Sequence, residues 1–327
     1  MITTDICIIG AGPVGLFAVF EAGLLKMRCH LIDVLPQVGG QLSEIYPHKP
    51  IYDIPGYPSI TAQELINNQM QQIEPFKPTF TLGERVDGLQ KQDDGSYVVV
   101  GSEGTQIHCQ VVVIAGGLGC FEPRKPEMEN LSNFEGKNVH YMVRNPEKFR
   151  DQRIVIAGGG DSALDWTIFL SDVAKEVTLV HRSDNFRGAP DSAEKVFNLA
   201  KSGKINLLLS HNLQSLNGNG HLESVLMTNK SKEDFIPLYG LSPKLGPIAD
   251  WGLNIDKNAI EVDTFDYSTN VERIYAIGDI NSYPGKLKLI LCGYHEAALM
   301  VQSAFKYVYP EQKLSFKYTT VNGINAF

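Results

Sequence analysis

The feature that most constrains this chain is a buried strand followed at once by a glycine-rich turn and a helix. Residues 5–9 (DICII) form a short apolar run typical of a strand inside a parallel sheet. The sequence GAGPVG fills residues 10–15, and a helical pattern follows over residues 16–25. In a GxGxxG turn the first glycine makes the tight turn, the second lets the backbone approach a pyrophosphate, and the third lets the helix pack on the strand. The residues predicted to contact a dinucleotide here are Gly10, Gly12, Pro13 and Gly15.

An acidic residue stands at the ribose position of this unit. The next strand, residues 28–32, ends in Asp33, eighteen residues past Gly15. A carboxylate at this place can accept hydrogen bonds from ribose hydroxyls. A glycine-rich turn alone is a weak signal, because such turns also join strands to helices where no ligand binds. Strand, glycines, helix, strand and terminal acid, in this order, predict a dinucleotide site.

The same pattern recurs in mid-chain. Residues 153–157 (RIVIA) form a second apolar strand, GGGDSA fills residues 158–163, and a helix is expected over residues 164–174. The glycine and alanine spacing is GxGxxA, which a second dinucleotide site would use in the same way. The residues predicted to contact it are Gly158, Gly160, Asp161, Ser162 and Ala163.

The ribose position of the second unit is basic. Its next strand, residues 177–180, ends in His181 and Arg182, and Arg187 follows five residues later. Cations suit the 2′-phosphate of NADP, whereas Asp33 suits an unphosphorylated ribose. Opposite charges indicate two different dinucleotides, so we predict FAD at the first turn and NADPH at the second. The alternative is that Arg182 and Arg187 are ordinary solvated charges near a strand end.

A feature near the C-terminus supports the assignment of FAD to the first turn and NADPH to the second. A strand over residues 273–277 leads into Gly278 and Asp279, and a helix is expected to begin near Glu296 and Ala297, after a turn around Gly293. An aspartate after a strand can accept a hydrogen bond from a ribityl hydroxyl, and a helix N-terminus can face the flavin pyrimidine oxygen. A Gly-Asp pair after a strand is also typical of a plain turn.

The chain is long enough for two domains. Its 327 residues correspond to about two domains of about 150 residues each. Proline- and glycine-rich crossings near residues 123–126 and 237–243 look like hinges. The predicted fold class is α/β, with two Rossmann-like three-layer ββα dinucleotide-binding domains of the disulfide-reductase flavoprotein type. We expect a discontinuous FAD-binding domain and an inserted NADP-binding domain, over residues 1–118 with 242–327 and residues 119–241.

Charge and hydropathy exclude several classes of partner. The net charge of −8 argues against a general binder of nucleic acid or anionic membranes. The sequence runs from Met1 directly into an apolar strand without a basic leader, and no stretch approaches the roughly 20 apolar residues of a membrane span. A cytoplasmic protein without a metal site is therefore expected.

Several short motifs carry a family likeness beyond the glycine turns. They are Gly39-Gly40-Gln41-Leu42, Ile45-Tyr46-Pro47 with Ile51-Tyr52-Asp53-Ile54, GGGDSALDW over residues 158–166, Leu245-Gly246-Pro247-Ile248, and Trp251-Gly252-Leu253. On these motifs the chain resembles the thioredoxin-reductase-like ferredoxin–NADP reductases of bacteria, which are homodimeric FAD enzymes of similar length. The likeness spans nearly the whole chain.

The resemblance implies roles for particular residues. Asp33, Gln41, Tyr46 and Asp279 would hold FAD, with the Tyr46 ring against the flavin, although Tyr46 could equally be a core residue. A C-terminal extension covers the other flavin face in this family, and Tyr318 occupies that position here; Phe316, or no stacking at all, is the alternative. The further residues expected to contact a cofactor are Phe121 and Thr320.

One departure from the family concerns the nicotinamide cofactor. Related reductases often show two consecutive arginines after the histidine, and here the second is Ser183. Loss of one cation weakens the case for the 2′-phosphate. Because Arg182 and Arg187 remain, NADPH is still expected to be preferred over NADH.

The positions of the cysteines indicate which kind of group can accept electrons from reduced flavin. The five cysteines, Cys7, Cys29, Cys109, Cys120 and Cys292, contain no CxxC or CxxxxC pair. A thioredoxin reductase would carry CxxC near the second glycine turn, and a lipoamide- or glutathione-reductase-like enzyme would carry a pair soon after Gly40. Both dithiol routes are missing, so reduced flavin must pass electrons to an outside acceptor.

The family implies that this acceptor is ferredoxin or flavodoxin, reached one electron at a time after hydride transfer from NADPH to flavin N5. Lys286 and Lys288 are candidates for a cationic dock, or else two solvated lysines. The alternatives are an NAD(P)H-dependent quinone, disulfide-protein or oxygen reductase on the same scaffold, and a nucleotide-binding redox-sensing module without turnover.

Overall fold

The chain forms two compact units in a computed structural model. Unit 1 comprises Met1–Phe121 and Pro243–Phe327, and unit 2 comprises Glu122–Ser242. The residues that the structure describes are 1–119, 122–123, 125–126, 128, 130–141, 143, 145–227, 234–237, 241–242, 245–315, 319–324 and 326–327.

Unit 1 is built on a five-stranded parallel sheet. Its strand order is β21-β10-β2-β3-β6, with bounds Ile274–Ala276, Val111–Ile114, Ile6–Ile9, Cys29–Asp33 and Thr79–Leu82. Ile6 lies opposite Cys29, and Ile9 lies opposite Ile32. Because all five strands are parallel, their carboxyl ends meet at one edge of the sheet, where ligands of α/β proteins bind.

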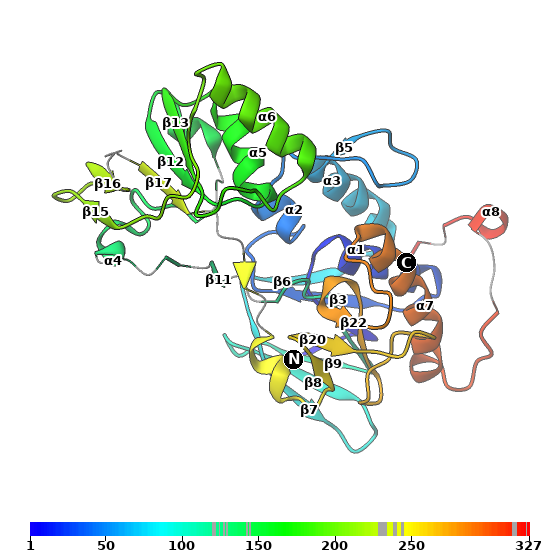
Figure 1. Cartoon of the computed structure of the whole chain (residues 1–327). Coiled ribbons are helices and arrows are strands. Elements are labelled where there is room, and N and C mark those ends of the chain that lie inside the picture. Colours follow the sequence, from blue (N-terminus) through cyan, green and yellow to red (C-terminus); the bar gives the residue numbers. More distant parts are fainter. Residues whose placement is uncertain are drawn as a thin grey trace. The chain divides into compact units, whose positions relative to one another are not determined.

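Two different layers cover the faces of this sheet. Ile6 and Ile8 face the helices, whereas Cys7 and Ile9 face a second sheet, as the alternation of a strand requires. The helices are α1 (Pro13–Leu24), α3 (Ala62–Ile73) and α7 (Ile290–Val308), and Figure 1 shows them on the side of the sheet opposite β7, β8 and β9. The second sheet has the order β1-β9-β8-β7, with bounds Ile2–Thr3, Gln106–Cys109, Tyr97–Gly101 and Val86–Lys91. Unit 1 therefore has the three-layer ββα architecture that the sequence predicts.

The remaining elements of unit 1 are short. They are α2 (Gln41–Glu44), β4 (Pro50–Ile51), β5 (Ile60–Thr61), η1 (Glu74–Phe76), η3 (Gly246–Asp250), β19 (Ile255–Asp256), β20 (Ala259–Glu261), η4 (Gly278–Ile280), β22 (Asn281–Ser282) and α8 (Thr319–Asn322). Helix α3 carries a capping box in which the Thr61 hydroxyl accepts from the Glu64 N–H while the Glu64 carboxylate accepts from Thr61.

Unit 2 repeats the plan on a smaller scale. Its parallel sheet has the order β14-β13-β12-β17, with bounds Asn206–Leu208, Glu176–Val180, Arg153–Ala157 and Asp234–Pro237. Helices α5 (Asp161–Leu170) and α6 (Pro190–Lys201) pack on one face. The other face is covered by α4 (Leu131–Phe134) and the hairpin of β15 (Ser215–Asn217) and β16 (Ser224–Leu226). The other elements are η2 (Pro146–Phe149) and the antiparallel pair β11 (Glu122–Pro123) and β18 (Leu241–Ser242).

Three helices begin earlier than the sequence predicts. Helix α1 begins at Pro13 and α5 at Asp161, because each glycine turn leads into its helix without a spacer. Helix α7 begins at Ile290 and not near Glu296, so the expected turn around Gly293 is wrong. Gly293 lies inside α7, where the absence of a Cβ lets the helix pack against Val14: an added Cβ would lie 2.4 Å from a Val14 methyl. This glycine therefore allows two helices to pack closely and does not interrupt α7.

Two general properties follow from the described residues. None of their helices combines the length and the apolar character that a membrane crossing needs. In the same part of the chain, no group of three or more histidine, cysteine, aspartate and glutamate side chains is arranged to hold a metal ion.

Candidate functional site

The first glycine turn contains two glycines that the fold itself requires and one that it does not. An added Cβ on Gly10, whose φ is +113°, would lie 2.4 Å from the Ala115 carbonyl oxygen, and one on Gly15 would lie 2.2 Å from the Gly10 oxygen. A Cβ on Gly12 would meet nothing within 4 Å. Gly12 is also the N-cap of α1 and offers no side-chain cap, while Pro13 opens the helix. The space beside Gly12 thus lies open in front of a helix N-terminus, where phosphates bind.

Asp33 is bonded to this turn. Its Oδ2 accepts from the Ala11 N–H at 2.6 Å, and its Oδ1 accepts from the Leu35 N–H at 2.9 Å. Burial raises the pKa of Asp33, and these two hydrogen bonds oppose the rise. Each carboxylate oxygen retains capacity for a further hydrogen bond. Asp33 therefore both fixes the turn and can accept from a ligand at the ribose position.

The Gly39–Gln41 segment packs against the same turn. The Gly39 N–H donates to the Ala11 carbonyl at 2.8 Å. Gly40 has a φ of +57°, and a Cβ on it would lie 3.2 Å from the Gly12 Cα. Gln41 begins α2, and its Nε2 lies 3.7 Å from the position of a Cβ on Gly117. The structure therefore brings Gln41 to the edge of the sheet where the first glycine turn lies.

Tyr46 and Asp279 also meet at this edge. Tyr46 is half-buried against the helical core, and burial followed by the charge of Asp279 raises its pKa. Asp279 lies in η4, directly after Gly278, where an added Cβ would lie 3.4 Å from a Val14 methyl at the start of α1. Burial raises the pKa of Asp279, while the charges of Lys286 and Lys288 oppose the rise. The turn that carries Asp279 thus packs on the same helix end as Gly12.

The second glycine turn has the same open position. Gly160 caps α5 without a side-chain cap, and a Cβ on it would meet nothing within 4 Å. A Cβ on Gly159 would instead lie 2.2 Å from the His181 ring. Asp161 and Ser162 are exposed in the first turn of α5, and Ala163 is buried. Unit 2 therefore also leaves space in front of a helix N-terminus.

The loop that carries the two arginines folds back over this turn. The Arg187 and Gly188 N–H groups both donate to the Gly159 carbonyl, at 2.7 and 3.1 Å, and the Ala189 N–H donates to Asp161 Oδ1 at 2.7 Å. Arg182 and Arg187 are exposed. Burial lowers the pKa of His181, the hydrogen bond to the Asn185 carbonyl opposes this effect, and the charges of Arg187 and Arg182 lower the pKa further.

Comparison with known proteins decides the family. Residues 4–298 match the family model described as pyridine nucleotide-disulphide oxidoreductase. This chain belongs to the pyridine nucleotide-disulphide oxidoreductase family. The match covers both glycine turns and confirms the family resemblance and the fold class that the sequence motifs predict.

Two relatives of this oxidoreductase are similar to it over nearly their whole length. Ferredoxin–NADP reductase 1 of Christiangramia forsetii is 61% identical over 337 residues, covering 100% of this chain and 96% of the relative. A ferredoxin–NADP reductase of Flavobacterium johnsoniae is 58% identical, covering 100% and 95%.

Solved structures with the same fold include a Lactococcus lactis thioredoxin reductase, with TM-score 0.79, 25% identity and coverage of 94% of this chain and 99% of that one. The T. acidophilum thioredoxin reductase has TM-score 0.78, 20% identity and coverage of 94% and 99%. At this level of identity the likeness is one of fold.

Sequence reasoning missed the environment of one lysine in this oxidoreductase. The sequence predicts Lys286 either as part of a cationic dock or as a solvated lysine, but its side chain is only 8% exposed and pairs with the buried Glu296. The expectation for Lys286 is therefore wrong, because a carboxylate ten residues away in the sequence takes up its charge. Lys288 is exposed, as a docking cation must be.

Three predicted residues remain to be placed. Phe121 and Tyr318, together with the alternative Phe316, lie outside the described residues. Thr320 lies in α8 and is exposed.

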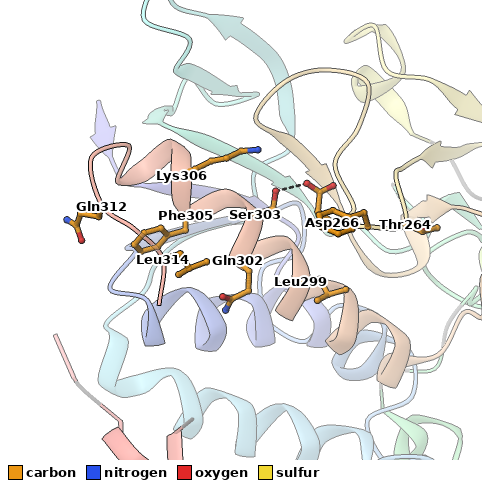
Figure 2. Close-up of a pocket in the computed structure, with 10 residues that line it drawn as sticks. Thr264, Asp266, Leu299, Gln302, Ser303, Phe305, Lys306, Gln312 and Leu314 are labelled. Atoms are coloured by element: carbon orange, nitrogen blue, oxygen red, sulfur yellow. Dashed lines mark hydrogen bonds between the residues drawn. The ribbon is translucent and has the colours of Figure 1, made fainter. Parts of the chain in front are cut away.

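A separate hollow lies along the C-terminal half of α7 in this oxidoreductase. Its volume is about 660 Å³, and Figure 2 shows the Ser303 hydroxyl donating to Asp266 at its wall. The residues that line it are Thr264, Phe265, Asp266, Leu299, Gln302, Ser303, Phe305, Lys306, Gln312 and Leu314. None of them is a residue predicted for a cofactor site, so the hollow is distinct from the two glycine turns.

Proposed function

We propose that this protein is an FAD-dependent ferredoxin–NADP reductase, which passes electrons between NADPH and an external one-electron carrier, ferredoxin or flavodoxin. The observation that carries the proposal is the 61% identity, over the full chain, to a protein named ferredoxin–NADP reductase. The two open glycine turns, with an acid at one ribose position and cations at the other, support it independently.

The residues of unit 1 fit FAD. The space beside Gly12 would accept the pyrophosphate, with Pro13 at the start of the helix and Gly10 and Gly15 shaping the turn. Asp33 would accept from the ribose and Asp279 from the ribityl chain, while Gln41 and Tyr46 would line the ring. Bound FAD supplies hydride and electron transfer, and the chain supplies orientation and a dry environment.

The residues of unit 2 fit a nicotinamide dinucleotide. The space beside Gly160 would accept its pyrophosphate, next to Gly158, Asp161, Ser162 and Ala163. Arg182 and Arg187, which both act on His181, would bind the 2′-phosphate of NADPH. With Ser183 in place of a third cation, we expect NADH to be used less well and not excluded.

The cysteines favour an outside acceptor over an internal dithiol. Among the described residues Cys7, Cys29 and Cys109 are buried and Cys292 is partly exposed, and all four are free. The sequence has no cysteine pair beside either glycine turn. This chain therefore lacks the dithiol by which a thioredoxin reductase would deliver electrons, although it shares that fold.

The proposal extends to assembly and to the C-terminal residues. We infer a cytoplasmic homodimer in which Tyr318 covers the second flavin face, with Thr320 and Phe121 as further cofactor contacts. Sedimentation of the FAD-bound protein tests the dimer. A Tyr318→Ser variant with an unchanged flavin spectrum would contradict the stacking role.

The decisive experiment uses the purified protein under anaerobic conditions. It is expected to be yellow, to bleach rapidly when NADPH is added, and then to reduce the host's own ferredoxins or flavodoxins. Bleaching followed by transfer only to quinone or oxygen in single-turnover assays would favour the alternative reductases. A protein that binds both dinucleotides without bleaching would be a sensing module and would overturn the proposal.

A further inference from the structure

The carboxylate of Glu296 is the centre of a polar cluster inside unit 1. It lies in α7 and is 0% exposed. Its Oε2 accepts from the Gly278 N–H at 2.7 Å and from Asn281 Nδ2 at 2.8 Å. Its Oε1 accepts from the Tyr283 hydroxyl at 2.9 Å and from the Lys286 ammonium. All four donors come from one short segment, so a single side chain fastens both ends of that segment to α7.

The ion pair between Glu296 and Lys286 is desolvated on both sides. The Lys286 side chain is 8% exposed and that of Glu296 is 0% exposed. Such a pair adds little stability over apolar side chains of the same volume, although removal of one partner is strongly destabilising. The pair is therefore expected to matter less for the stability of unit 1 than for the position of the residues around it.

The pair holds the turn that carries Asp279. The N–H that Glu296 receives belongs to Gly278, the residue directly before Asp279. The Lys286 charge lowers the pKa of the Asp279 carboxyl and so opposes the effect of burial, whereas the Glu296 charge raises it. Asp279 acts in turn on Tyr46. One buried pair thus bears on both residues proposed for the ribityl and ring end of FAD.

We propose that Glu296 and Lys286 are positioning residues for the flavin site: Glu296 anchors the Gly278–Ile280 turn to α7 and holds the Lys286 ammonium beside Asp279. This inference rests on the proposed function, because it assigns a role at the proposed FAD site. With the pair intact, the turn that carries Asp279 stays in place. The Lys286 ammonium also opposes the effects of burial and of the Glu296 charge on Asp279, and so favours the carboxylate form that accepts a hydrogen bond from the cofactor. Neither positioning residue needs to contact FAD itself.

The test separates a structural pair from a positioning pair. Flavin is removed from the wild type and from the variants K286M, E296Q, K286M/E296Q and K286R. Thermal unfolding of each apoprotein and its dissociation constant for FAD, from quenching of flavin fluorescence, are then measured. A wild type that binds no FAD would overturn the proposed function, which is a different result from any difference among the variants.

Each single charge deletion is expected to lower both apoprotein stability and FAD affinity, because it leaves an unpaired buried charge. The double variant removes both charges, so its apoprotein is expected to regain most of the lost stability. Its FAD affinity is expected to stay about tenfold below that of the wild type, because the carboxylate that anchors the Gly278 N–H and the cation that acts on Asp279 are both missing. K286R keeps the positive charge and a charge-assisted hydrogen bond to Glu296, so it is expected to bind FAD within about threefold of the wild type.

A double variant that binds FAD as tightly as the wild type would overturn the inference, because the pair would then be structural only. If the double variant does not fold, the pH dependence of FAD binding decides between K286M and K286R. The charged and titratable groups that act on Asp279 or on which it acts are Lys286, Lys288, Glu296 and Tyr46. In K286M the Asp279 carboxyl lacks the Lys286 charge and is expected to take up a proton at a higher pH than in K286R. On acidification, FAD affinity should therefore fall at a higher pH in K286M than in K286R. Identical profiles would overturn the inference.

Discussion

Replacement of Gly12 by alanine is expected to separate folding from cofactor binding. The backbone of Gly12 is extended, with φ −74° and ψ 179°, and a Cβ there meets nothing within 4 Å. Alanine is a poorer N-cap than glycine by about 0.5 kcal/mol. It also restricts the unfolded chain, which stabilises the fold by about 0.4–1 kcal/mol. The two effects nearly cancel, so the unfolding temperature of the apoprotein should change little.

The expected loss falls on FAD. The methyl group would fill the space in which the pyrophosphate meets the helix N-terminus, and at least one hydrogen bond to a charged oxygen would be lost. Such a bond contributes about 1.5–3 kcal/mol, which corresponds to about a 10- to 150-fold increase in the dissociation constant. Titration of the apoprotein with FAD, followed by flavin fluorescence, measures this increase.

Two further variants serve as matched controls. Gly160 occupies the equivalent open position in unit 2, so G160A should weaken NADPH binding and leave FAD binding unchanged. G15A would place a Cβ 2.2 Å from the Gly10 oxygen and should destabilise the apoprotein even without ligand. A G12A protein that binds FAD like the wild type would refute the reasoning, and so would equal effects of G12A and G160A on both dinucleotides.

Further predictions concern the nicotinamide site, the docking surface and acid stability. The variant R182A/R187A should lower kcat/KM for NADPH by about tenfold or more while changing that for NADH little, because each guanidinium would contribute a charged hydrogen bond to the 2′-phosphate alone; equal losses for both cofactors would contradict this. K288Q should weaken the dependence of ferredoxin reduction on ionic strength, and an unchanged salt profile would exclude this lysine from the dock. Burial lowers the pKa of His30, so the folded protein keeps it neutral while the unfolded chain takes up a proton as the pH falls below about 6.5. The unfolding temperature should therefore fall between pH 7.5 and pH 5.5, and it should fall less in a His30→Gln variant.

The strand–turn–helix units could be predicted from sequence because their determinants are local. Gly15 is needed where the turn contacts itself, because an added Cβ would meet the Gly10 oxygen five residues earlier in the chain. The contact of Gly10 with Ala115 is not local, but the GxGxxG spacing marks Gly10 as well. The start of α7 could not be predicted in this way. Gly293 looks like a helix breaker in the sequence, but its missing Cβ makes room for Val14, which is far away along the chain. Only the packed structure distinguishes these two uses of glycine.

The environments of the charged residues could not be predicted from the sequence either. Lys286 and Lys288 are equivalent in sequence, yet one is buried against Glu296 and the other is exposed. Asp33 was predicted as a ribose partner, and its bonds to the Ala11 and Leu35 N–H groups could not be foreseen from spacing alone. Charge can be counted from a sequence, whereas its partners depend on which segments the fold brings together.

The loop between β13 and α6 has a consequence for how such enzymes diversify. Its attachments to the second glycine turn run from the backbone N–H groups of Arg187 and Gly188 to the Gly159 carbonyl. Mutation can therefore exchange the exposed side chains at 182, 183 and 187 while the loop keeps its path. Substitutions at these three positions could therefore change the preference for one nicotinamide coenzyme while the turn that faces the pyrophosphate stays intact.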